Sequence, residues 1–263
     1  MPFTLSHPAA VLPLRKYGVL SALVIGSMMP DVMYFLPFIP MHQSYGHTLP
    51  GLFFFCLPGG LLLLWLFHSL LKKPLISLFP SSQQEKLLAA SDHFHFGPGK
   101  RFTEIAASIF VGAVTHVVWD SFTHSNGWGT LTIPVLRTQV TEIPGFIFML
   151  AEILQFVSSI VGALVLLLAY RHWLRRAEEP KEQKRVHVPL LIRGLLLLGV
   201  IAGAFAPAAA RLLLDPQFWL HSRRRLIGYG AIDGIKVVCL ELLLFSLVWQ
   251  LVVRSRRSHS PEP

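Results

Sequence analysis

The chain has 263 residues, of which 53% are hydrophobic and only 14% are charged, and its mean hydropathy is +0.55. Soluble domains carry about 25% charged residues, so this composition argues against a soluble protein and favours one that crosses a membrane several times. The net charge of +9 would suit a nucleic-acid-binding protein. However, lysine and arginine lie at the ends of the apolar segments, where membrane topology requires them, so we expect no nucleic-acid partner.

The first 35 residues predict a short helical hairpin. One helix is expected over residues 8–17 and a second over residues 19–29, because a glycine and a proline interrupt the helical pattern. Each piece is about 15 Å long, which is too short to cross a bilayer alone. Folded back on each other, the two pieces bring His7 beside Asp31. The open alternative is a single helix over residues 17–35, which would leave His7 on the other side of the membrane.

Five longer segments have the length and the low charge of membrane-spanning helices. The first of them contains no Asp, Glu, Lys or Arg. The sequence therefore predicts an all-α fold, a polytopic membrane helical bundle of about five full spans in addition to the short N-terminal helical hairpin. The five segments are residues 49–71, 103–122, 143–170, 194–214 and 234–253.

The polar segments between the spans indicate a domain organisation and an orientation. Fifteen lysines and arginines lie in the two long connectors and the C-terminal tail, against four in the loops on the opposite side. The positive-inside rule therefore predicts that the connectors and the C-terminus are cytoplasmic. We expect a membrane-embedded domain with the candidate site at residues 1–170, a basic cytoplasmic connector at 171–193, two C-terminal transmembrane helices at 194–253 and a disordered basic tail at 254–263.

Histidine and aspartate side chains gather near the outer ends of these segments. His116, Asp120 and His124 follow one another at four-residue spacing, so they lie along one stripe of a helix. Imidazole and carboxylate groups suit zinc, or manganese or iron, and a cation provides the partner that lipid cannot give to a buried carboxylate. One ion, or two ions sharing a carboxylate, would be compatible with the full set, which is His7, Asp31, His47, His116, Asp120 and His124.

Two further polar residues lie in the next predicted span. Glu152 and Gln155 are separated by three positions in an otherwise apolar segment. We expect them either to support the ligands from behind, as peripheral site residues, or to form hydrogen bonds between helices.

The segments that carry these residues resemble a known family. MPFTLSHPAAVLPL, GSMMPDVMYFLP, HTLPGLFFFCLP and GAVTHVVWDSFTHSNGW look like the successive motifs of an uncharacterised family of bacterial integral membrane proteins with a domain of unknown function. That family is similar in pattern to the membrane-bound metal-dependent hydrolases, whose motifs are an early His, Pro-Asp, a His followed by a small hydroxylated residue, and His-x-x-x-Asp. The motif order also resembles, distantly, the zinc-dependent phospholipase C fold.

The resemblance implies a ligand set, a location and an activity. It implies a multi-pass protein of the bacterial cytoplasmic (inner) membrane, and the distribution of lysine and arginine described above predicts that the site lies near the outer face. The expected activity is hydrolysis of an ester or phosphoester, for example in a lipid headgroup, by metal-activated water with Asp31 or Asp120 as the general base. An ion- or proton-coupled transporter or channel and a non-catalytic membrane protein with a structural metal are the alternatives. The implied ligands are His7, Asp31, His47, His116 and Asp120, with His124 outside the minimal pattern.

Overall fold

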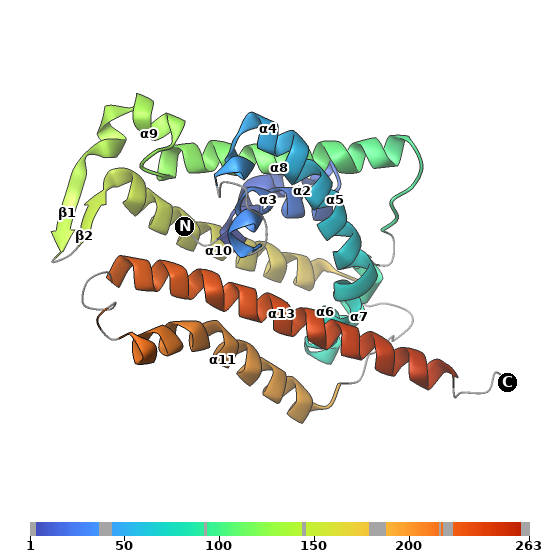
Figure 1. Ribbon diagram of the computed structural model, residues 1–263. Helices are drawn as coiled ribbons and strands as arrows, with labels where there is room; N and C mark the ends of the chain where they lie inside the picture. The colour runs from blue at the N-terminus through green and yellow to red at the C-terminus, as the bar shows by residue number, and fades with distance from the viewer. Residues whose placement is uncertain are drawn as a thin grey trace. The chain divides into compact units, whose positions relative to one another are not determined.

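Helices account for most of the computed structural model (Figure 1), which describes residues 4–36, 44–91, 94–143, 146–178, 188–215, 217 and 223–258. Within these ranges the strands are β1 (Gln139–Ile143) and β2 (Phe146–Met149), which pair antiparallel. The predicted all-α class is therefore confirmed.

The chain folds as two compact units. Unit 1 comprises Met1–Leu64 and Phe96–Trp173, and unit 2 comprises Trp65–His95 and Leu174–Pro263. Every candidate site residue lies in unit 1. The units differ from the expected domain boundaries, because residues 65–95 group with the C-terminal helices rather than with the N-terminal part of the chain.

Five helical segments in the described part of the chain are long and apolar enough to cross a membrane. They coincide with the five predicted spans and run somewhat beyond them at most ends, because the polar residues next to each apolar run continue the helix. The segments are Leu49–Ser77, Lys100–Thr132, Leu150–Arg176, Leu190–Leu214 and Gly228–Val253.

The N-terminal hairpin forms as predicted, from short helical pieces. Helix α2 ends at Gly26 and α3 is a separate single turn, so the alternative of one continuous helix over residues 17–35 is not adopted. A short 3₁₀ turn, η4 (Tyr45–His47), precedes the first span. The pieces of the hairpin are η1 (Thr4–Ser6), α1 (Pro8–Val11), η2 (Leu12–Lys16), α2 (Leu20–Gly26), α3 (Met29–Val32) and η3 (Met33–Phe35).

Helix α2 crosses helix α8 (Lys100–Thr123) at a very short distance. Glycines on both helices permit this approach. A Cβ atom on Gly26 would lie 2.1 Å from the carbonyl oxygen of Ile109, and one on Gly112 would lie 2.3 Å from that of Leu23. Small residues allow such backbone-to-backbone packing between membrane helices. The crossing fixes the chain around residue 27 against the middle of α8.

The first span departs from a simple α-helix at two places, whereas the third span is one continuous α-helix. The first span is built from α4 (Leu49–Gly51), α5 (Leu57–Leu66) and α6 (Lys72–Ser77), joined by the π-helical turns η5 (Leu52–Cys56) and η6 (Phe67–Leu71). The third span, α10, begins at Leu150 and ends at Arg176.

The predicted start of the third span at residue 143 is therefore wrong. Residues 139–143 and 146–149 pair as the strands β1 and β2 instead of forming a helical turn. The sequence QVTEIPGFIFM is rich in β-branched and aromatic residues on either side of Pro-Gly, a composition that favours a strand pair over a helix. Two short helices, α9 (Trp128–Thr132) and η7 (Pro134–Arg137), lead from α8 into this hairpin.

Unit 2 contains α7 (Ser81–Ser91) and two long helices that lie side by side, α11 (Leu190–Leu214) and α13 (Arg223–Ser258) (Figure 1). Gly203 and Gly234 lie where these two helices approach each other most closely. Helix α13 continues through residues 254–258, which belong to the segment expected to be a disordered tail.

Candidate metal centre

Four side chains from three separate stretches of unit 1 come together. Asp31 lies in α3, and His47 is the last residue of η4. His116 and Asp120 occupy successive turns of α8. The glycine before His47 lets η4 approach α3, because a Cβ atom there would lie 2.5 Å from the carbonyl oxygen of Pro30. We refer to the four residues as the Asp/His cluster.

The spacing of the ligand atoms in the Asp/His cluster is that of groups arranged around a cation. One ligand atom from each residue lies within 4.8 Å of all the others. Nε2 of His47 lies 3.6 Å from Oδ1 of Asp31 and 3.4 Å from Oδ2 of Asp120. Nε2 of His116 lies 3.6 and 3.3 Å from the same two oxygens. Ligands held about 2.1 Å from a tetrahedral ion lie about 3.4 Å apart, whereas N–H···O bonds measure about 2.7–3.2 Å.

The buried carboxylates of the cluster require a positive charge close to them. The side chains of Asp31, His116 and Asp120 are 3%, 0% and 7% exposed. Two carboxylates cannot be buried together without compensating positive charge, since their desolvation is unfavourable and they repel each other. A divalent cation would neutralise the two carboxylates.

The hydrogen bond made by His116 prepares its other nitrogen for a cation. Nδ1 lies 2.7 Å from the backbone carbonyl oxygen of Ser27, which accepts only, so Nδ1 carries the proton. In the neutral ring Nε2 then presents a lone pair toward the carboxylates. Among the described residues this buried nitrogen has no hydrogen-bond partner. A carbonyl that fixes the tautomer in this way is the usual support for a metal-binding histidine.

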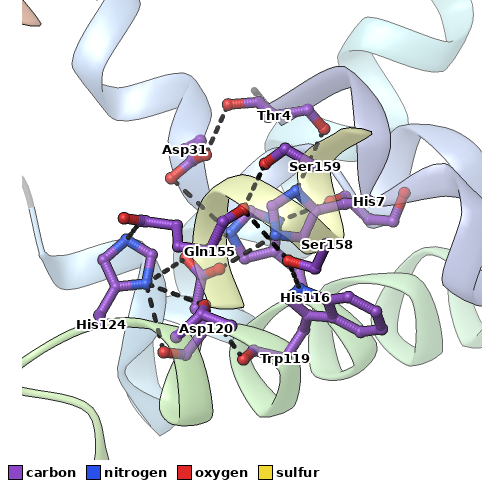
Figure 2. Close-up of polar contacts among 12 residues, drawn as sticks. Thr4, His7, Asp31, His116, Trp119, Asp120, His124, Gln155, Ser158 and Ser159 are labelled. Atoms are coloured by element: carbon purple, nitrogen blue, oxygen red, sulfur yellow. Dashed lines mark hydrogen bonds and ion pairs between the residues drawn. The ribbon is translucent and has the colours of Figure 1, made fainter. Parts of the chain in front are cut away.

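His7 adjoins the cluster through the other oxygen of Asp120 (Figure 2). Its Nε2 lies 3.0 Å from Oδ1 of Asp120, and its Nδ1 lies 3.2 Å from the backbone oxygen of Thr4. The ring also stacks on that of His116, with 3.9 Å between the centroids. The hairpin therefore delivers His7 to the site, as predicted, although its nitrogen is not one of the four atoms that surround a common point. Its role as a ligand stays a prediction.

Thr4 holds the first carboxylate from behind. Its hydroxyl donates a hydrogen bond of 2.6 Å to Oδ2 of Asp31, which leaves Oδ1 directed into the cluster (Figure 2). Burial alone would raise the pKa of Asp31, but a protonated His116 ring and the Thr4 hydroxyl outweigh burial and hold that pKa below its usual value; a bound cation would take the place of the charge on His116. Asp31 is therefore ionised at neutral pH, the state that a metal ligand requires.

Replacing Thr4 by valine is expected to weaken metal binding without removing a ligand. The valine keeps the shape of threonine but loses the hydroxyl that orients Asp31, and the loss of such a supporting group lowers metal affinity about 10- to 100-fold. Competition of the purified protein with a fluorescent zinc chelator measures the change. The matched variant Thr4→Ser retains the hydroxyl and should bind like the wild type, so equal weakening in both variants would argue against this role.

His124 and Gln155 form a layer outside the cluster. Nδ1 of His124 lies 3.2 Å from the backbone oxygen of Asp120, and Nε2 lies 2.9 Å from the side-chain amide nitrogen of Gln155 (Figure 2). Nδ1 of His124 also lies 3.5 Å from Oδ2 of Asp120, but His124 is not one of the four residues whose ligand atoms surround the common point. Glu152 accepts a hydrogen bond from the backbone N–H of Met149 at the start of α10. His124 and Gln155 thus lie beside the cluster, whereas the contact of Glu152 is with Met149, and a peripheral role for the three residues stays a prediction.

Access to the cluster from solvent is restricted to one side. The side chain of His47 is 22% exposed and that of His124 is 28% exposed, whereas His7, at 2%, is enclosed. A substrate or a water molecule would therefore reach the cluster past His47 and His124.

The sequence analysis did not identify Thr4 and Ser27. Thr4 precedes His7 by three residues in the first motif, and its proximity to that motif is the only signal that could have indicated it. Ser27 contributes its backbone oxygen, so its residue type carries no information about the contact.

A comparison with protein families gives one match of nearly full length. The family model described as Domain of unknown function (DUF4184) covers residues 1–252, which include both units and every residue of the site. Neither a curated protein nor a solved structure matches the chain.

Proposed function

The chain belongs to the DUF4184 family, and we propose that it is an integral membrane metal-dependent hydrolase that cleaves an ester or a phosphoester. The observation that carries the proposal is the Asp/His cluster, whose nitrogen–oxygen distances of 3.3 to 3.6 Å suit ligands of one divalent cation. Zinc fits the donor set best, and manganese and iron also accept imidazole and carboxylate ligands.

The residues of the chain have distinct tasks in this proposal. Asp31, His47, His116 and Asp120 would hold the cation, and the Ser27 carbonyl keeps the His116 ring in the correct tautomer. When bound, such a cation would act as a Lewis acid, and with a coordination position open beside the four side chains it would make hydroxide available at neutral pH. His47 lies on the exposed side of the cluster, where the scissile group would enter.

The two carboxylates of the Asp/His cluster are the groups that would accept a proton in this proposal. Asp31 and Asp120 are the acidic residues of the cluster, and each has one oxygen toward the common point and one toward a supporting side chain. The second oxygen of Asp120 lies 3.0 Å from Nε2 of His7, so this imidazole can share the proton that the carboxylate would accept. We therefore assign the general base to Asp120 and a holding role to Asp31.

The proposed location is the bacterial cytoplasmic membrane, with the site near the outer face. Five apolar helices support a membrane protein. The fifteen-to-four distribution of lysine and arginine supports cytoplasmic connectors. The cluster lies at the end of α8 that is remote from the basic connector before Lys100.

Ion or proton transport is the alternative function. The positions of the polar residues in unit 1 support it less well than hydrolysis. A relay needs polar groups along the whole length of the spanning helices. The buried acidic side chains described in unit 1, Asp31, Asp120 and Glu152, belong to the cluster or to the layer beside it. In unit 2, Asp233 is paired with Arg211 and Lys236.

An activity assay on the detergent-purified protein tests the proposal. Chromogenic phosphomonoester, phosphodiester and carboxylester substrates should reveal hydrolysis that a chelator abolishes and that zinc, manganese or iron restores. His116→Ala should lower the rate at least about 100-fold, since the loss of a metal ligand outweighs the 10- to 100-fold effect of a supporting group. His172→Ala, which changes an exposed histidine of α10, should be as active as the wild type.

Two outcomes would contradict the hydrolase. Bound metal without turnover of any of these substrates would indicate a structural ion. Metal-dependent ion movement in liposomes without cleavage would indicate transport.

A further inference from the structure

The turn of the N-terminal hairpin carries two positive charges and an exposed aromatic ring. Arg15 and Lys16 end η2, and both are exposed. Tyr17 is 77% exposed, and Nζ of Lys16 lies 4.7 Å from the centroid of its ring. Tyrosine and basic side chains of this kind are typical of segments at a membrane interface.

Neither cation has a carboxylate partner within the described ranges of the chain. The acidic residues of unit 1 are used elsewhere. Asp31 and Asp120 belong to the Asp/His cluster, and Glu104 pairs with Arg101. Among the described residues, the two cations are therefore left available to a ligand from outside the chain.

The turn lies alongside the spanning helices and not above them. A Cβ atom on Gly18 would lie 2.7 Å from the hydroxyl oxygen of Ser108, which is eight residues into α8. On α10 the neighbour is Val165, eleven residues before the end of the helix at Arg176. At about 1.5 Å per residue, the turn lies about 12 to 16 Å along these helices from their ends.

A groove of about 470 Å³ opens at this place. Its walls are apolar, its rim is basic, and it runs between the hairpin and the lipid-facing side of α10. An anionic phospholipid combines an apolar chain with a negatively charged headgroup, and basic side chains near the membrane surface attract such lipids. The lining residues are Ala9, Leu12, Pro13, Arg15, Lys16 and Val165.

We propose that this groove binds an anionic phospholipid. The phosphate contacts Arg15 and Lys16, and an acyl chain lies along Leu12 and Val165. The lipid would supply the counter-charge that the protein lacks and would hold the hairpin against α10. Since the same hairpin presents His7 and Asp31 at its other end, the lipid site adds a second attachment for the segment that builds the metal centre. This inference stands independently of the hydrolase proposal.

Native mass spectrometry of the protein in detergent with added lipid tests the groove. The wild type should bind phosphatidylglycerol more tightly than phosphatidylcholine. The double variant Arg15→Gln/Lys16→Gln should bind phosphatidylglycerol about thirtyfold more weakly, because each cation near anionic lipid contributes about a factor of five. Val165→Trp should weaken binding as well, since it fills the groove and leaves the charge unchanged.

A second pair of adjacent exposed arginines provides the matched control. Arg175→Gln/Arg176→Gln removes the same charge from the end of α10, and neither of these residues lines the groove. This variant should retain wild-type lipid binding, and all variants should keep their metal content. Equal binding of the two lipids, or equal weakening in both double variants, would overturn the proposal, and so would unchanged binding in Val165→Trp.

Discussion

Alanine in place of His116 is expected to remove the bound metal from the purified protein. His116 is the most enclosed member of the Asp/His cluster, with a side chain that is 0% exposed, so water cannot easily replace its nitrogen as a ligand. Its Nε2 also approaches both carboxylates, at 3.6 Å from Asp31 and 3.3 Å from Asp120. Without it the site keeps three of four donors around two uncompensated carboxylates, and metal affinity should fall at least about 100-fold.

The metal content per chain, measured by mass spectrometry after dialysis, reports this change. His124→Ala is the matched control, because His124 follows eight residues later on the same stripe but directs its nitrogens to the Asp120 backbone and to Gln155. The control should retain nearly the full wild-type amount. Equal metal loss in the two variants would mean that His124 is needed for metal binding as well, so that four residues are not the whole site. Full metal content in His116→Ala would mean that the metal binds elsewhere.

Valine in place of Gly112 is expected to destabilise unit 1 and to empty the metal site together. A Cβ atom at this position would lie 2.3 Å from the carbonyl oxygen of Leu23 and 2.8 Å from the backbone nitrogen of Ser27. Both contacts are with backbone, so α2 would have to move away from α8. The movement would withdraw the Ser27 carbonyl from His116. Overpacking of this kind lowers the free energy of unfolding by about 3 kcal/mol or more when the backbone cannot move.

Thermal unfolding in detergent, combined with metal analysis, measures both effects of Gly112→Val. Gly199→Val is the control, since no atom lies within 4 Å of a Cβ at position 199. The control should unfold at the wild-type temperature and retain its metal. A stable Gly112→Val protein with its full metal content would contradict the close crossing of α2 and α8.

Much of the site could be predicted because its residues follow simple geometric rules. A spacing of four residues on a helix is enough to place His116 and Asp120 on one face. The breaks in the N-terminal segment made a hairpin more favourable than a long helix, and the hairpin delivers both His7 and Asp31 to the end of α8. The apolar runs likewise fixed the number of spans, because the thickness of a bilayer sets their length.

The parts that escaped prediction depend on contacts between distant segments. The hydroxyl of Thr4 reaches Asp31 across 27 positions, and only the folded hairpin brings them together. The support of His116 by Ser27 uses a backbone carbonyl, which every residue possesses. The sequence predicts a helix from residue 143, which includes β2, because the apolar residues continue without a charged break from residue 146 into α10.

X-ray absorption spectroscopy of the metal in the wild-type protein tests the central claim most directly. If side chains from α3, η4 and α8 surround one cation, the spectrum will show two imidazole nitrogens together with carboxylate oxygens at about 2.0–2.2 Å and no sulfur. The spectrum of the His47→Ala variant should lack one of the two imidazole contributions. A sulfur shell, or a metal surrounded by water oxygens alone, would contradict the assignment of the Asp/His cluster as the metal centre.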